Sequence, residues 1–295
     1  FNYTEFYDLV KKVQKENRPL IKTHFAPFGL FKETYFNVMG GFDTRFRCSR
    51  EDSDFMLRLK ANNLEPLQTW NAMVYHYKCV SSRGTDWHKN DVSSDIKNQW
   101  QTRADKEEVK RFIRKWGYFG HKYKPKYNTA LILDINTAPD LNFLIQIEPY
   151  FNKLVLNDKI ILNQLINLVE YEGSYFSNKR WNYSSSHWNQ VKNSFMVDNI
   201  RDRIILKENY LSSDVIIEAD YFSLVNNLNE ENNNFITHSN DILHNLLSND
   251  YENYKGEYKI GNFKIKVNML KDINEEHLDS KQYHLLLDLN KFKFK

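Results

Sequence analysis

The second half of the chain alternates apolar stretches of strand length with helix-like stretches, and this alternation limits its fold more than any other feature. Thr129–Ile135 has the apolar run of a buried strand, and Leu141–Phe151 has helical spacing. Lys153–Leu156 predicts a second strand and Ile160–Tyr171 a second helix. Strands joined by helices in this order usually run parallel in one sheet. The pattern therefore predicts an α/β fold with a parallel sheet.

Further strands are expected closer to the C-terminus. Asp214–Glu218 predicts one strand and Leu285–Leu289 another. Between them, Tyr258–Val267 has the pattern of a β-hairpin that turns at Gly261 and Asn262. These segments extend the α/β unit towards residue 295.

The first half of the chain is richer in predicted helices. Helical spacing indicates helices over Thr4–Glu16, Lys32–Val38, Glu51–Asn62 and Asp105–Trp116, the third with Ser49 or Ser53 as its N-cap. A period of two predicts a strand over Gln68–Lys78.

A basic run, Lys122–Lys126, separates the two halves and contains Pro125. We interpret it as a linker, because proline and clustered charge disfavour continued helix or strand. A chain of 295 residues is long enough for two cores of roughly 100–200 residues each. The sequence thus predicts one domain over residues 1–122 and a second α/β domain, of unknown role, over residues 127–295.

Composition excludes several classes of partner and site. A net charge of +3 is too small to indicate nucleic acid as a partner. Cys48 and Cys79 form neither a zinc framework nor a disulfide framework, which favours a reducing cytoplasm. No apolar run is long enough to span a bilayer. The fourth helix has a basic face, which comprises Lys110, Arg111, Arg114 and Lys115. A solvated face is the better explanation of it, and peripheral contact with a membrane surface, through a lipid or a lipid-linked acceptor, is the alternative.

Two short motifs carry the candidate chemistry. Gly40 and Gly41 precede Phe42-Asp43, and Glu51, Asp52 and Asp54 lie at the start of a predicted helix. The helix dipole stabilises an anion there, and a carboxylate facing a cleft can accept a proton from a hydroxyl nucleophile. The plainer interpretation is a helix with solvated acids after a glycine turn.

The combination of the two motifs resembles the signature of family 2 and related inverting glycosyltransferases of the GT-A fold. The resemblance covers roughly residues 20–120 and is carried by Gly40-Gly41-Phe42-Asp43, Glu51-Asp52-Ser53-Asp54-Phe55 and Arg58-Leu59. Val74-Tyr75-His76 is similar to the strand that ends in a histidine in that family, and Lys115-Trp116-Gly117 to a common ending of bacterial and phage members. The resemblance implies the C-terminal, acceptor-side part of a GT-A domain.

The resemblance also implies a role for each matched residue. Asp52 would be the general base that deprotonates the acceptor hydroxyl, and Glu51 would bind acceptor hydroxyls. Asp54 would support the local network or the acceptor, while Gly40 and Gly41 would shape the wall of the site. His76 would help to hold a divalent metal, Mn²⁺ or Mg²⁺, on the donor diphosphate; alternatively, it is a core histidine of a strand.

The reaction implied is transfer of a hexose, with inversion, from a nucleotide-diphosphate sugar to a saccharide or lipid-linked saccharide, as in polysaccharide biosynthesis. Family members bind the donor with an N-terminal half that carries a DxD metal motif, and no such half is found between Phe1 and the glycine motif. We therefore expect a fragment that binds nucleotide-sugar weakly and is inactive alone. The alternative is a non-catalytic carbohydrate-binding or assembly module that retains the acceptor-side fold.

Overall fold

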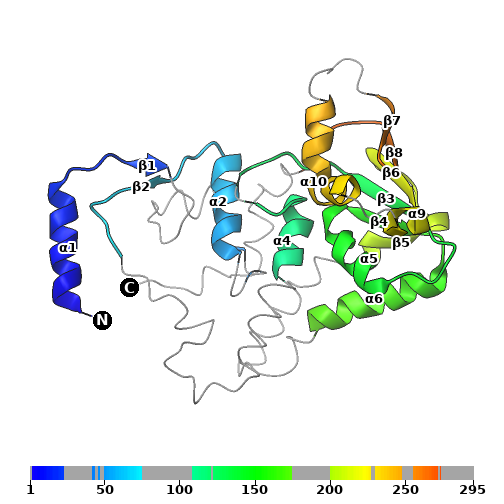
Figure 1. Ribbon diagram of the computed structural model, residues 1–295, viewed down its shortest axis with the longest axis horizontal. Helices are drawn as coiled ribbons and strands as arrows, with labels where there is room; N and C mark the ends of the chain where they lie inside the picture. The colour runs from blue at the N-terminus through cyan, green and yellow to red at the C-terminus, as the bar shows by residue number, and fades with distance from the viewer. Residues whose placement is uncertain are drawn as a thin grey trace, which may run out of the picture.

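The computed structural model describes residues 2–22, 42–43, 46, 50–74, 108–120, 122–174, 200–226, 230–247, 255–271 and 273. The described part is an α/β structure with a six-stranded mixed sheet and a separate two-stranded sheet (Figure 1). The six-stranded sheet lies in the second half of the chain, so the α/β class predicted there is confirmed.

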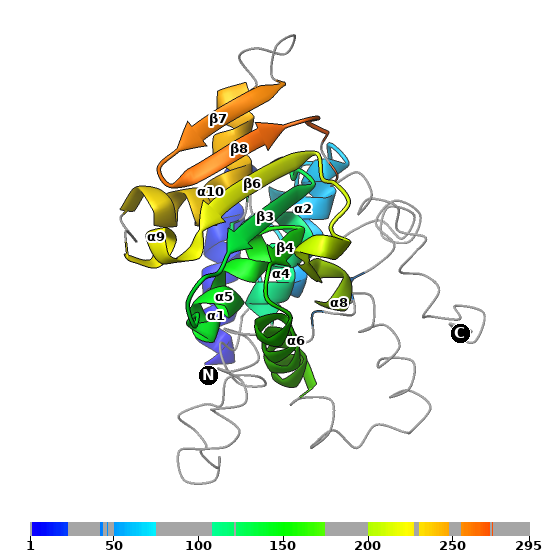
Figure 2. The same cartoon turned by 90° about the vertical axis from the view of Figure 1, so that its right-hand side faces the viewer.

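Four parallel strands form the centre and one side of the six-stranded sheet, whose order is β5-β4-β3-β6-β8-β7 (Figure 2). These four strands are β3 (Thr129–Asp134), β4 (Lys153–Leu156), β5 (Ile204–Leu206) and β6 (Val215–Asp220). On the other side, β7 (Gly256–Ile260) and β8 (Phe263–Val267) form an antiparallel hairpin that pairs with β6 through β8. The predicted hairpin is confirmed, and it makes the sheet mixed rather than parallel throughout.

Helices of the second half cover one face of this sheet. That face presents Leu131, Leu133 and Ile217, which belong to one core cluster together with Leu144 and Phe235 from helices. The helical elements with residues in this cluster are α5 (Leu141–Ile147), α6 (Lys159–Ser174), α8 (Ile200–Arg203), α9 (Tyr221–Asn226) and α10 (Glu230–Leu247).

The opposite face of the sheet has a smaller apolar cluster. Ala130, Ile132 and Val155 are buried there, and Tyr210 packs against them. Tyr210 follows the short 3₁₀ helix η5 (Lys207–Asn209), which lies between β5 and β6. The connection from β5 to β6 therefore passes over this face, which turns towards the viewer in Figure 2.

The predicted segments of the second half agree with the structure, with shifted ends. The helix expected over Leu141–Phe151 ends as α-helix at Ile147 and continues as the 3₁₀ helix η4 (Glu148–Tyr150). Pro149 explains the change, because it lacks the N–H that an α-helical hydrogen bond needs. The sequence did not predict β5, α8, α9 or α10, and the strand expected over Leu285–Leu289 lies outside the described residues.

The first half contributes three described helices, α1 (Tyr3–Lys15), α2 (Glu51–Ala61) and α4 (Val109–Trp116), and all three were predicted. The helix expected over Lys32–Val38 lies outside the described residues. The short strands β1 (Ile21–Lys22) and β2 (Leu67–Gln68) pair antiparallel and form the only sheet described in this half.

The strand predicted over Gln68–Lys78 is wrong for residues 69–74, because in the described part of this segment the strand β2 ends at Gln68. Residues 75–78 lie outside the described residues. The backbone N–H of Asn71 donates to the Thr69 hydroxyl at 3.1 Å, and the Asn71 carbonyl accepts from the Gln14 side chain at 3.1 Å. Side chains of this kind offer the backbone an alternative to strand pairing, so a turn forms at Trp70–Asn71.

The described apolar cores of the two halves are separate clusters. Phe46, Leu57 and Trp116 belong to one cluster of the first half, whereas the main cluster of the second half begins at Tyr127. The division into domains 1–122 and 127–295 stays a prediction. In the described part of the chain, no helix has both the length and the apolar character needed to cross a membrane.

Candidate functional site

The start of α2 brings the predicted acids together. Arg50 precedes the helix with left-handed backbone, φ 70°, and its carbonyl accepts from the Asp54 N–H at 2.8 Å. Neither Ser49 nor Ser53 is the N-cap, because Arg50 holds that position without a side-chain cap. A non-glycine residue in this conformation costs about 1–2 kcal/mol, so surrounding contacts must hold it. One such contact is the Arg50 guanidinium, which lies 4.5 Å from the centre of the Phe119 ring.

Glu51 and Asp52 are both half-buried in the first turn of α2. Asp52 accepts a hydrogen bond from the Ser53 N–H at 2.7 Å through one carboxylate oxygen. This contact fixes the side chain near the helix N-terminus, where the helix dipole favours a negative charge.

Glu51 has a different environment from its neighbour. Burial raises the pKa of Glu51, and the nearby carboxylates of Asp52 and Glu108 raise it further, against the opposing effects of its backbone hydrogen bond and Arg50. One of its oxygens, Oε2, is buried without a hydrogen-bond partner. Of the two acids, Glu51 is therefore the one whose proton affinity the fold has increased.

Asp54 lies inside the protein rather than at its surface. It is 0% exposed, and its Oδ2 accepts from the Arg58 Nε at 3.0 Å. Its Oδ1 accepts from the Trp116 indole N–H at 2.9 Å and lies 2.6 Å from the Lys115 Nζ. With three partners of this kind, Asp54 holds α2 against α4. Its predicted role towards the acceptor stays a prediction.

Lys115 also reaches the glycine–aspartate motif. Its Nζ donates to Asp43 Oδ2 at 2.8 Å, and Asp43 is 1% exposed. One ammonium group therefore bridges the Asp of the first motif and the last Asp of the second, residues that are far apart in sequence. Phe42 and Phe55 pack beside this bridge with ring centres 4.8 Å apart.

The bridge by Lys115 was not predicted, although a signal for it exists. Lys115 lies beside Phe112 and Trp116 on the inward side of an amphipathic helix, where a lysine needs an anionic partner. Glu108 precedes this helix, is buried and raises the pKa of Glu51. No feature of the sequence indicated that Glu108 lies near Glu51.

The remaining predicted site residues, Gly40, Gly41 and His76, lie outside the described residues. Within the described part, no group of three or more His, Cys, Asp or Glu side chains could hold a metal ion. The metal-binding role of His76 therefore stays a prediction.

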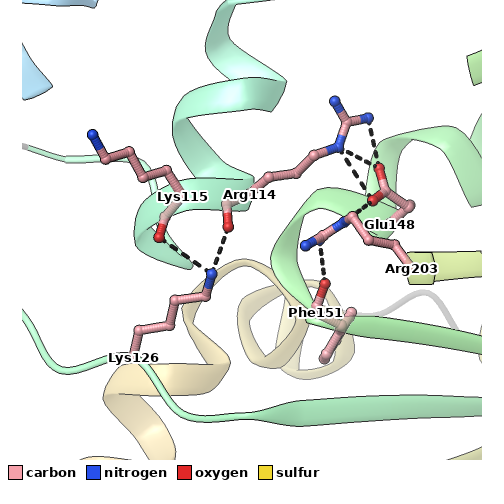
Figure 3. A network of polar contacts seen from close by, with 6 residues as sticks. All are labelled: Arg114, Lys115, Lys126, Glu148, Phe151 and Arg203. Atoms are coloured by element: carbon pink, nitrogen blue, oxygen red, sulfur yellow. Dashed lines mark hydrogen bonds and ion pairs between the residues drawn. The ribbon is translucent and has the colours of Figure 1, made fainter. Parts of the chain in front are cut away.

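The other side of α4 binds the second half of the chain through Glu148. Arg114 donates to this carboxylate at 2.7 and 2.9 Å, and Arg203 donates to it at 2.8 Å (Figure 3). Arg203 also donates to the Phe151 carbonyl at 2.5 Å. Despite complete burial, which acts in the opposite direction, these two arginines lower the pKa of Glu148 to about 2.

The predicted linker is part of the same junction. Lys126 is 3% exposed, and its Nζ donates to the carbonyls of Arg114 and Lys115 at the end of α4 (Figure 3). Lys124 forms an ion pair with Asp241 of α10. Of the three lysines in the basic run, Lys124 and Lys126 therefore form contacts that hold the two halves together.

Comparison with known proteins gives no match: no protein-family model, no curated protein and no solved structure is similar to this chain.

Proposed function

We propose that the region around α2 is the acceptor side of a GT-A glycosyltransferase domain and that Asp52 is its general base. The observation that carries this proposal is that the four motif acids differ in burial and in their partners. Asp43 and Asp54 are buried and bound to Lys115, whereas Glu51 and Asp52 remain half-exposed at the helix N-terminus. If Glu51 and Asp52 only capped the helix in solvent, the fold would not need to bury Asp43 and Asp54 beside them.

In the proposed reaction, the acceptor hydroxyl loses its proton to the Asp52 carboxylate as its oxygen attacks the anomeric carbon of the donor. The bond from that carbon to the diphosphate breaks in the same step, which inverts the configuration. A positioned general base contributes roughly 100- to 10,000-fold to rate. The Ser53 N–H holds the Asp52 side chain in place for this role.

Glu51 would bind acceptor hydroxyls next to the base. Its buried Oε2, which has no hydrogen-bond partner, can accept a hydrogen bond from a hydroxyl group. The raised pKa of Glu51 also makes it a rival base, because proton transfer is most efficient when the pKa of the base approaches the working pH. The two carboxyl groups therefore need separate tests.

The test is transfer activity with a panel of UDP- and GDP-hexoses and oligosaccharide acceptors, measured by release of nucleoside diphosphate and by the mass of the product. We expect Asp52→Asn to reduce kcat about 100-fold or more, and Glu51→Gln mainly to raise the KM for the acceptor. Glu65→Gln, an exposed change just beyond α2, is the matched control.

A large loss of kcat in Glu51→Gln with near-normal turnover in Asp52→Asn would move the base to Glu51. Near-normal turnover in both variants would contradict the proposal. Saccharide binding without nucleotide release, unchanged by either substitution, would favour the non-catalytic module instead.

A further inference from the structure

The strand β7 forms one edge of the six-stranded sheet, where no further strand of the described residues pairs with it (Figure 2). Its residues alternate between the two faces of the sheet. Glu257 and Lys259 are exposed, whereas Gly256, Tyr258 and Ile260 are half-buried. A strand at an edge presents backbone N–H and C=O groups that can pair with another strand.

The register of the β7–β8 hairpin determines which backbone groups point away from the sheet. The hairpin turns over two residues, and its closing pair is Ile260 and Phe263. The residues that close such a turn exchange both hydrogen bonds, and bonded and non-bonded pairs alternate along the ladder from there. Tyr258 therefore directs its backbone groups towards β8, whereas Glu257 and Lys259 direct theirs outward. No backbone hydrogen bond from elsewhere in the described part of the chain reaches these outward groups.

Charges on the exposed face of the hairpin are balanced at every position except one. Glu257 is the register partner of Lys266, and Lys264 is that of Glu218 across the β6–β8 pair. The partner of Lys259 on β8 is Lys264, which has the same charge. Like charges directly opposite each other destabilise a strand pair. Within the ladder, an acid could come opposite Lys259 only from a strand added at the outer edge.

The hairpin is held rigidly by the helices beneath it. The Asn262 N–H donates to Asn232 Oδ1 of α10 at 3.3 Å, and Asn262 Nδ2 donates to the Ser223 carbonyl of α9 at 2.9 Å. Gly261 has left-handed backbone, φ 51°, and a Cβ there would lie 2.5 Å from Asn232 Oδ1. The edge is therefore formed before a partner binds, which reduces the entropy cost of association.

We propose that the chain forms a symmetric dimer in which β7 pairs antiparallel with β7 of a second copy, with the two-fold axis at Tyr258. In this register Glu257 of each copy lies opposite Lys259 of the other, so both lysines receive an acid. The same two residues are those whose backbone groups point outward, so each Glu257–Lys259 pair also exchanges N–H···O=C bonds. One register thus satisfies the charges and the backbone groups together.

The inner face of the strand fits the same register. Tyr258 and Ile260 pack against the main core cluster and remain half-buried at the edge. In the dimer, the two copies of Tyr258 lie opposite each other, and Ile260 lies opposite Gly256. The apolar layer under the sheet therefore continues from one copy into the next.

Other pairings of two copies leave like charges together. A parallel pairing in register would bring Glu257 beside Glu257 and Lys259 beside Lys259. An antiparallel pairing centred on either residue would place that residue opposite itself. Charged side chains on an edge usually oppose pairing with another copy. Here the two charges have opposite sign and are symmetric about Tyr258, so they oppose every register except the proposed one.

The test is sedimentation equilibrium of the whole chain over a wide range of concentrations, where we expect a reversible dimer. Lys259→Glu would place acids opposite each other twice in the dimer, and Glu257→Lys would do the same with lysines. Each substitution should weaken self-association about tenfold or more. Both positions are exposed, so the fold should persist, and circular dichroism checks that it does.

An equal mixture of the two single variants should restore the dimer. One strand then carries two acids and the other two lysines, so every cross-strand pair is again complementary. Lys259→Pro should also abolish the dimer, because it removes an outward N–H that β8 does not use. Lys207→Glu is the matched control, since it makes the same change of charge at an exposed position of η5 and should leave self-association unchanged.

The inference is overturned if the unchanged chain is monomeric at every concentration. It is also overturned if Lys207→Glu weakens the dimer as much as Lys259→Glu does, or if the mixture of single variants stays monomeric. None of these measurements depends on Asp52 or on transfer activity, so this inference and the proposed function can fail separately.

Discussion

Lys115 lies at the edge of the apolar face of a helix, yet it is 3% exposed and its ammonium group lies between the carboxylates of Asp43 and Asp54. Two negative charges around one positive charge are stable in the interior only because Arg58 also binds Asp54. The network thus contains two acids and two bases. The network joins three motif segments, which contribute Asp43, then Asp54 with Arg58, and then Lys115.

Removing the central cation of this network should strongly destabilise the fold. We expect Lys115→Met to lower the free energy of unfolding by about 3–5 kcal/mol, because it removes the buried ammonium group that both Asp43 and Asp54 bind. Urea unfolding at pH 7 measures the change. Lys110→Met, at a half-buried position of the same helix, is the control and should change stability far less. Equal effects of the two substitutions would show that the bridge does not stabilise α2 against α4.

Glu51 should destabilise the fold at neutral pH, as acids kept for function commonly do. Its pKa is higher in the folded chain than the ordinary value of 4.5, so the folded state binds a proton more tightly than the unfolded state. The contribution of Glu51 to stability is then greatest at acid pH and falls as pH rises past that ordinary value. Glu51→Gln should therefore be more stable than the unchanged chain at pH 7.5 and not at pH 4.

Thermal or urea unfolding of the two proteins at both pH values measures this difference. Glu5→Gln is the control, because Glu5 is an exposed glutamate in the first turn of α1. A Glu51→Gln protein that is less stable at pH 7.5 would mean that the carboxylate has a stabilising partner and is not held for a ligand.

At the scale of elements, the end of α4 depends on a glycine that contacts the second half of the chain. Gly117 has left-handed backbone, φ 80°, and its N–H donates to the Ile113 carbonyl at 2.6 Å. Its carbonyl accepts from the Asn240 side chain of α10 at 3.0 Å, and the same side chain accepts from the Tyr127 N–H at 2.9 Å. The end of one helix is therefore joined to another helix and to the start of the sheet.

We expect Gly117→Ala to lower the free energy of unfolding by about 2 kcal/mol or more. An alanine there has unfavourable backbone, which costs about 1–2 kcal/mol, and its Cβ would lie 2.6 Å from the Asn240 Nδ2. Gly120→Ala is the matched control, since its Cβ would meet no atom closer than 3.5 Å. Similar stabilities of the two variants would contradict the role assigned to Gly117.

The elements that could be predicted from sequence are those with strong local signals. The helices α1 and α4 have amphipathic spacing, and β3 contains an unbroken apolar run over residues 130–133. By contrast, β5 has only three residues, and α10 contains three consecutive asparagines, which are poor helix formers. Packing against the sheet, through Phe235 and Leu243, supplies the stability that local propensity lacks in α10.

The candidate sites likewise contain residues that local sequence signals bring together and residues that only the tertiary fold brings together. The motif spacing indicated that Glu51 and Asp52 lie together, because both belong to one helical turn. It could not reveal that Lys115 bridges Asp43 and Asp54, because tertiary contacts decide this pairing. A long-range pairing leaves no period in the sequence. The inward position of Lys115 on its helix indicates that it needs an anionic partner, but it does not indicate which one.

Considered as a whole, the molecule has α4 between its two halves. One side of this helix directs Lys115 towards α2, and the other directs Arg114 towards Glu148 (Figure 3). Any movement of the second half relative to α2 must therefore strain one of these buried contacts. The acceptor side proposed near α2 is therefore connected to the second half of the chain through this one helix.

Glu148 is the centre of that connection, and its protonation should weaken it. A carboxyl group with a lower pKa in the folded chain stabilises the fold above its ordinary pKa of 4.5, and this stabilisation is lost as pH falls towards about 2. A shift from 4.5 to about 2 corresponds to about 3 kcal/mol at neutral pH. Glu148→Gln should lower the free energy of unfolding by a similar amount at pH 7, because Arg114 and Arg203 would lose a buried anion.

Urea unfolding at pH 7 and at pH 3 checks this prediction. The difference in stability between the unchanged chain and Glu148→Gln should be largest at pH 7 and smaller at pH 3, since at pH 3 the unfolded chain binds a proton at Glu148 that the folded chain mostly does not, and this favours the unfolded state. Glu208→Gln, an exposed change in η5, should show no such difference at either pH. If the effect of Glu148→Gln is equally large at both pH values, its cause is packing rather than charge, and the ion pairs with Arg114 and Arg203 would not hold the halves together.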